Sequence, residues 1–156
     1  MKPIFWILLI LPMVLVASTL WGNRAPLFAP PGPWVRLKTY LGSNWACTAP
    51  EHPFPELRQP LFDLPADRLQ ALVEQALQGL GWRYRRLGAG HLHAEVVTPL
   101  LHFTDDLDIR ILPEGPHSHL QLCSRSRVGR ADFAANQRHI LDLLDQVHRQ
   151  AEALSR

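Results

Sequence analysis

The chain has little cysteine and little charge for its length. It has two cysteines in 156 residues, and charged residues make up 19% of it, below the roughly 25% of typical soluble domains. Two cysteines exclude a disulfide-rich scaffold and a cysteine-rich zinc module. The net charge of +2 excludes a strongly basic nucleic-acid-binding protein, so we expect no nucleic acid as a partner.

Motifs of known catalytic chemistry are absent. The chain has no H-E-x-x-H, C-x-x-C, G-x-S-x-G or Walker sequence, so we predict no catalytic residue and no cofactor. A zinc site needs three or four converging ligands. A polar sheet edge that faces solvent accounts for the histidines more simply, and we predict no metal site. These histidines form two pairs with a spacing of two residues: His91 and His93, and His117 and His119.

Residues 1–22 form the longest apolar stretch. No charged residue occurs from Pro3 to Trp21, close to the roughly 20 residues of a membrane-spanning helix. A signal anchor is favoured over a cleaved signal peptide, because the run exceeds the usual apolar core of about 7–15 residues. We therefore expect the membrane as a partner through this segment. The protein would lie in the inner membrane with its domain in the periplasm, or be periplasmic or secreted if the segment is cleaved. The basic residues on either side leave the orientation open.

Residues 23–62 are predicted to form an extended strap. Nine of the 14 prolines lie between Gly22 and Pro65, and proline prevents long helices. The segment is too apolar for a solvated linker, so we expect its apolar side chains to dock on the following domain. The alternative is that they rest on a membrane interface, where Trp and Tyr are enriched. These side chains are Phe28, Trp34, Tyr40, Leu41, Trp45, Phe54, Leu57 and Phe62.

Residues 63–156 are predicted to form an α+β domain. Apolar residues recur at three- and four-residue steps from Leu69 to Leu80 and from Ile140 to Leu154, which indicates two amphipathic helices. Between them, four segments near 82–85, 92–96, 107–111 and 120–123 alternate apolar and polar residues, as half-buried strands do. The pattern predicts a two-layer α-β-β-β-β-α unit, in which a four-stranded antiparallel sheet carries both helices on one face.

The end of the last predicted strand carries a recognisable signature. Residues 124–130 read S-R-S-R-V-G-R, and Asp132, Asn136 and Ile140 follow at fixed spacings. With the upstream F-T-D-D-L-D-I-R at 103–110 and L-G-W at 80–82, this resembles the bacterial and plastid domain of unknown function 1499. The chain departs from the family's pattern at Ala134, where glycine is usual, and around Cys47, where N-C-V-S-S is only faintly matched. The resemblance implies a domain often found behind a signal or anchor, and it implies no mechanism.

The polar residues of this region are the candidate site. Arginine forks match carboxylates, so we favour a paired network that joins the last strand to the last helix. Alternatively, the arginines and a helix N-terminus could bind a phosphate, a lipid headgroup or a carboxylate. Asp105 and Asp106 are poor acid/base partners, because neighbouring strand residues point to opposite faces. The site comprises Asp105, Asp106, Asp108, Arg110, Arg125, Arg127, Arg130, Asp132, Asn136 and Arg138.

Cys47 and Cys123 form the only possible disulfide, which would join the strap to the last strand in an oxidising compartment. The alternative of two free thiols stays open. We predict an envelope module that binds a partner protein or an anionic or amphipathic ligand, and a module without catalysis is favoured over an enzyme. Two other classes are an envelope hydrolase that uses the Asp/Arg cluster and a carrier with an apolar cavity between sheet and helices.

Overall fold

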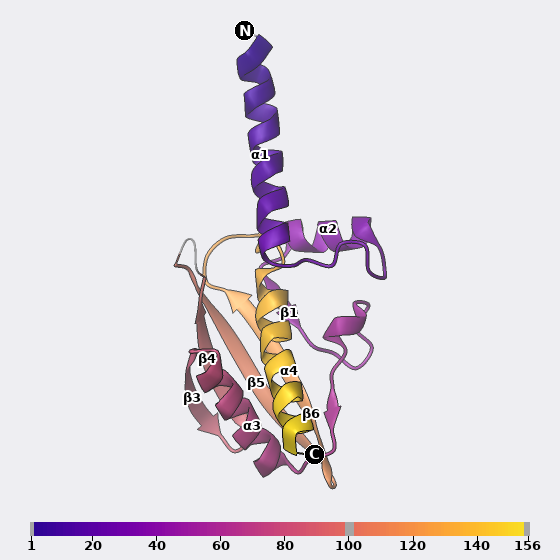
Figure 1. Cartoon of the computed structure of the whole chain (residues 1–156), viewed down its shortest axis with the longest axis vertical. Helices are drawn as coiled ribbons and strands as arrows, with labels where there is room; N and C mark the ends of the chain where they lie inside the picture. The colour runs from indigo at the N-terminus through magenta and orange to yellow at the C-terminus, as the bar shows by residue number, and fades with distance from the viewer. Residues whose placement is uncertain (1, 99–101, 155–156) are drawn as a thin grey trace.

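The computed structural model describes residues 2–98 and 102–154, and it has two layers behind a projecting N-terminal helix (Figure 1). The sheet layer contains β3 (Arg83–Gly88), β4 (His91–Val97), β5 (Thr104–Glu114) and β6 (His117–Ser126). The helical layer contains α3 (Ala66–Gly79) and α4 (Ala135–Leu154), which pack against each other on one face of the sheet. The predicted α+β class is confirmed.

Alternation along the strands sorts their side chains between the two faces of the sheet. On β5, Leu107 and Ile109 are fully buried under the helices, while Asp106 and Asp108, which alternate with them, point to the open face. Leu120 and Leu122 of β6 continue the buried row. Leu69, Leu77, Ile140 and Leu143 of the two helices pack against it and complete the core. Burial of this continuous apolar layer is the main stabilising contribution to the fold.

The prediction of four strands was wrong, because the sheet of the described residues has six. The order is β1-β6-β5-β4-β3, and β2 also pairs with β6. All pairs are antiparallel. The additional strands come from the proline-rich strap: β1 (Trp45–Cys47) and β2 (Leu61–Phe62). With three and two residues, these strands are too short to show an alternating pattern. β3 forms the opposite edge of the sheet.

The strap is only partly docked. A 3₁₀ turn, η1 (Pro55–Leu57), lies between β1 and β2. Tyr40, Phe54, Leu57 and Phe62 are buried in the core, as expected. The expectation was wrong for Phe28, Trp34, Leu41 and Trp45, which are exposed. The strap therefore has one docked face and one that meets solvent.

The N-terminal segment is helical. Helix α1 (Lys2–Gly22) projects away from the domain, and α2 (Pro33–Gly42) runs crosswise at its base (Figure 1). Leu20, in the last turn of α1, is buried in the core cluster. Over the residues described, no helix has the length and apolarity needed to cross a bilayer.

Candidate functional site

The sheet divides the predicted polar cluster between its two faces. Asp105 is 1% exposed and lies beneath α4, whereas Asp106, one residue further, lies on the open face. The same alternation turns Ser124 inward and Arg125 outward on β6. Asp105 and Asp106 therefore do not converge on one site, which removes the carboxylate pair that the hydrolase alternative would use.

On the open face, Arg127 connects two carboxylates. Its Nε and Nη2 donate to the two Asp106 oxygens at 2.9 and 2.6 Å, and Nη2 also donates to Glu95 at 2.5 Å. His93 Nε2 lies 3.1 Å from Asp106. The hydrogen bonds from Arg127 hold the pKa of Asp106 below its usual value, despite partial burial. Bidentate pairing of this kind fixes the end of β6 to β5.

Asp108 is the centre of a second set of contacts on this face. It accepts from Arg110 Nε at 3.0 Å, and its other oxygen lies 2.6 Å from His91 Nε2. Burial disfavours the charged carboxylate, but these two partners outweigh that cost and lower the pKa of Asp108. Asp106 and Asp108 thus both have arginine and histidine partners, and these contacts form a network within the sheet.

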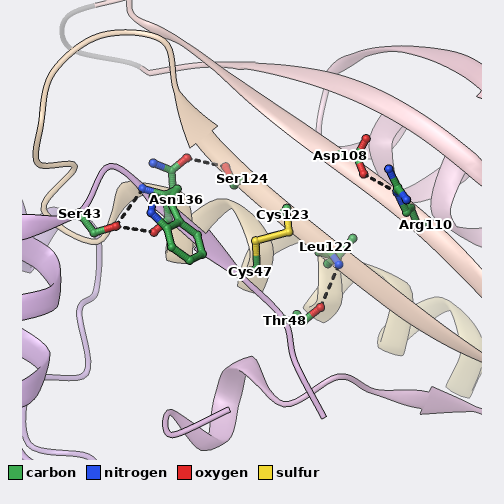
Figure 2. Close-up of a disulfide and its surroundings, with 10 residues drawn as sticks. Ser43, Cys47, Thr48, Asp108, Arg110, Leu122, Cys123, Ser124 and Asn136 are labelled. Carbon is green, nitrogen blue, oxygen red and sulfur yellow. Dashed lines mark hydrogen bonds and ion pairs between the residues drawn. A yellow bond between two sulfur atoms is a disulfide. The ribbon is translucent and has the colours of Figure 1, made fainter. Parts of the chain in front are cut away.

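Asn136 is the centre of a buried polar hub between β6 and α4. The side chain is fully buried. Its Oδ1 accepts from Ser124 Oγ at 2.6 Å, as Figure 2 shows. Its Nδ2 lies 2.9 Å from Ser126 Oγ, 2.6 Å from an Asp132 oxygen and 2.9 Å from the Asn44 carbonyl. The hub therefore joins the last strand, the start of α4 and the strap.

Asp132 caps the start of α4. Its two oxygens accept from the backbone N–H groups of Ala134 (3.0 Å) and Asn136 (3.2 Å), which would otherwise be unpaired at the helix start. Burial raises the pKa of Asp132 above its usual value, and its hydrogen bonds from Asn136 and Ala134 offset this only in part. The residue thus works as a half-buried helix cap.

Asp105 has a histidine partner. His139 Nε2 of α4 lies 2.9 Å from one Asp105 oxygen, and Trp82 packs edge-on against the His139 ring with centroids 5.9 Å apart. The second Asp105 oxygen is buried without a hydrogen-bond partner among the described residues. This pair ties β5 to α4 next to the hub.

The remaining predicted residues are dispersed. Arg138 pairs with Asp142 one turn along α4. Arg125 and Arg130 are exposed, and neither forms an ion pair within the described ranges. The cluster thus has a paired part on the sheet, a buried part under α4 and two exposed arginines that are available for an external anion.

The structure joins Cys47 to Cys123 in a disulfide (Figure 2). The two residues face each other directly across β1 and β6, with Cα atoms 4.1 Å apart. Next to them, the Leu122 N–H donates to Thr48 Oγ1 at 2.9 Å. The bond therefore fastens the strap to the last strand on the face opposite the helices.

Sequence reasoning missed a buried ion pair within the strap. Arg36 is fully buried, and its Nη1 and Nη2 donate to the two Glu56 oxygens at 2.6 and 2.9 Å. It also stacks over the Phe54 ring at 4.3 Å and donates to the Pro30 carbonyl. A lone arginine in a proline-rich segment carries no periodic signal, and its partner lies 20 residues away.

Two further features bear on ligands. His93, Glu95 and Asp106 place one potential metal ligand each within 4.8 Å of one another, but Arg127 already binds both carboxylates. A pocket of about 170 Å³ lies beside the disulfide, between α2, β1 and the start of α4, and Tyr40, Trp45 and Phe54 contribute to its lining. The pocket lies outside the sheet–helix interface, which is where the carrier alternative would place its cavity.

The fold is a two-layer α+β domain, in which the polar contacts of the hub hold the last strand, the strap and the last helix together. The chain belongs to the family described as protein of unknown function (DUF1499), whose sequence model matches residues 44–147. The resemblance seen in the S-R-S-R-V-G-R signature is thus confirmed. Comparison with curated proteins finds no match.

Proposed function

We propose that this protein is a cell-envelope module that binds or supports a partner and does not catalyse a reaction. The observation that carries the proposal is the Cys47–Cys123 disulfide, because such bonds persist in oxidising compartments and are rare in the cytosol. The uncharged stretch from Pro3 to Trp21 supports export or anchoring. The paired and buried acids support a binding role over hydrolysis. Arg125 and Arg130 would contact an anionic partner.

Thiol trapping in cells tests the location. The full chain is expressed in a bacterium with a periplasm, alkylated in intact and lysed cells, and separated into cytoplasm, periplasm and membrane. We expect neither cysteine to react without a reductant, and the chain to leave the cytoplasmic fraction. The Cys47→Ser variant is the matched control, because it leaves Cys123 free to react. Two reactive thiols in a cytoplasmic wild-type protein would contradict the proposal.

A further inference from the structure

Three chain segments meet at the base of α1. These are the connection 23–32, helix α2 and the connection 127–134, and we call their outward side the basal surface. Asn23 Nδ2 donates to the Phe133 carbonyl at 2.8 Å, and the Phe133 N–H donates to the Tyr40 carbonyl at 3.1 Å. In Figure 1 all three segments lie at the end of the domain from which α1 projects. The contacts hold them as one surface crosswise to α1.

The basal surface exposes large aromatic side chains. Phe28 is 88% exposed and Trp34 is 81% exposed, and Trp21, in the last turn of α1 next to this surface, is 87% exposed. Between α1 and the connection 23–32 lies an apolar groove of about 690 Å³, whose lining includes Val16, Leu20, Leu27 and Leu41. Single exposed apolar residues need no explanation, but a contiguous apolar patch indicates an interaction site.

The exposed charged side chains of this surface are all cations. The first acidic residue in the chain is Glu51, and the one acid of the connection 127–134, Asp132, is half-buried and caps α4. Arg24, Lys38 and Arg130 are exposed and have no acidic partner within the described ranges. Glu56, the acid that contacts α2, is bound by the buried Arg36. The basal surface therefore presents cations beside aromatic rings.

Helix α2 has one buried side and one side that faces outward. Arg36 and Tyr40 are buried against the strap, while Trp34, Lys38 and Leu41 face outward. Helices that lie in a membrane interface combine outward apolar or aromatic residues with Lys or Arg. Trp favours the headgroup level, and basic residues favour anionic headgroups. A protein partner that covered this surface would have to match both the rings and the cations.

We propose that the basal surface docks on a phospholipid bilayer that contains anionic headgroups. The inference rests on the proposed envelope function and adds a contact to it, because α2 and the connection 127–134 would themselves touch lipid. The domain would then sit at a fixed height above the bilayer. The hydrogen bonds that join Asn23 and Tyr40 to the backbone of Phe133, in the connection 127–134, would then hold the sheet in a fixed position relative to the bilayer.

Quenching of Trp34 by brominated lipid tests the contact. The purified full chain is reconstituted with phosphatidylcholine vesicles, with or without phosphatidylglycerol, that carry bromine near the headgroup end of the acyl chains. In the Trp34→Phe variant, the part of the tryptophan fluorescence that brominated lipid quenches should be smaller than in wild type. Trp82→Phe is the matched control and should lose none, because Trp82 packs against His139 in the domain. The Trp34 component should be stronger with phosphatidylglycerol present.

Charge variants test the anionic preference. Each exposed Lys or Arg near an anionic surface strengthens binding roughly fivefold. The triple variant Arg24→Gln, Lys38→Gln, Arg130→Gln should reduce Trp34 quenching to the level seen with neutral vesicles. Arg68→Gln with Arg149→Gln, at the start of α3 and the end of α4 at the far end of the domain (Figure 1), should leave quenching unchanged.

The outcomes separate the two proposals. If the chain floats with vesicles but Trp34→Phe quenches like wild type, the basal contact is overturned and the envelope function stands. If the chain neither floats nor reaches the envelope in cells, both fail. If sedimentation shows a dimer in which Trp34 is shielded from iodide without lipid, the surface belongs to a second copy and the bilayer proposal is overturned.

Discussion

Asn136 Nδ2 at the start of α4 donates a 2.9 Å hydrogen bond to the Asn44 carbonyl, which precedes β1. The two residues are 92 positions apart in the chain. The Ser126 N–H donates to the same carbonyl at 2.9 Å. One backbone oxygen of the strap thus accepts hydrogen bonds from both the last strand and the last helix, so the strap is part of the domain's structure.

Replacement of Asn136 should strongly destabilise the domain. Asn136→Ala leaves the buried Ser124 Oγ without this partner and removes one of the two donors to the Asn44 carbonyl, which keeps the Ser126 N–H. An unsatisfied buried group costs about 1–3 kcal/mol. We expect a loss of about 3 kcal/mol in the free energy of unfolding, measured by urea denaturation. Asn44→Ala is the control: it removes one exposed hydrogen bond to the Gly129 carbonyl and should cost about 1 kcal/mol or less. Equal effects would refute a special role for the hub.

Loss of the disulfide should also lower stability. The bond spans 76 positions, and loop-closure entropy for a loop of that length is worth on the order of 4 kcal/mol. The double variant Cys47→Ser, Cys123→Ser should lower the urea midpoint to that of the reduced wild type. If reduction leaves the wild-type midpoint unchanged, the pairing of β1 with β6 does not depend on the bond.

Arg36 should be the most sensitive basic residue. Arg36→Met leaves the Glu56 carboxylate without its bidentate partner. Because Arg36 is fully buried and Glu56 is half-buried, we expect a cost of about 3 kcal/mol, the low end for a buried pair. Arg36→Lys should recover only part of this loss, because an ammonium cannot form the fork. Exposed Arg58 is the control, and Arg58→Met should stay within about 0.5 kcal/mol of wild type. Thermal unfolding of the three variants compares them directly.

Acid should weaken the fold through Glu56. Burial disfavours its charged form, but the hydrogen bonds from Arg36 and Gln137 outweigh this and set its pKa below the ordinary 4.5. A lowered folded-state pKa gives stability that is present above pH 4.5 and is lost as the pH falls through the folded-state value. The free energy of unfolding should therefore decrease below pH 4.5, and Glu56→Gln should flatten that decrease. An unchanged slope in the variant would assign the acid loss to other carboxylates.

Asp132 should act in the opposite direction. Burial raises its folded-state pKa above the ordinary 3.8, so its protonation in acid favours the folded state. Asp132→Asn keeps one of the two acceptor oxygens of the helix cap and removes this titration. As the pH falls through the folded-state pKa toward 3.8, the variant should lose stability more steeply than wild type, as measured by urea titrations at a series of pH values. A shallower slope would contradict this prediction.

The sequence predicted the core elements because their side chains are periodic. Helices α3 and α4 and strands β3 to β6 each show a 3.6- or 2-residue pattern, and the structure places them as one antiparallel sheet with two helices on one face. Strands β1 and β2 could not be found that way, because pairing with β6 decides them and not their own composition. The ion pair of Arg36 and Glu56 was missed because its two residues are 20 positions apart and leave no periodic pattern in the sequence.

The candidate site was predicted as residues but not as an arrangement. The alternation along β5 explains why Asp105 and Asp106 lie on opposite faces of the sheet. It cannot predict that His139 contacts Asp105 or that Asn136 donates to the Asn44 carbonyl. Ala134 shows the converse. Its φ of +69° is in the left-handed region that favours glycine, which explains why the family's pattern has glycine there.

Strand β3 leaves an open edge whose chemistry limits how molecules meet one another. Arg83, Arg85 and Arg86 are all exposed along it, and its register with β4 shifts between Arg86 and Gly88. Charged side chains and bulges both discourage a strand of another molecule from adding to a sheet. At the opposite edge lie β1 and β2, which are only three and two residues long, and very short edge strands also discourage such addition. Both edges of the sheet therefore disfavour the growth of fibres by strand addition.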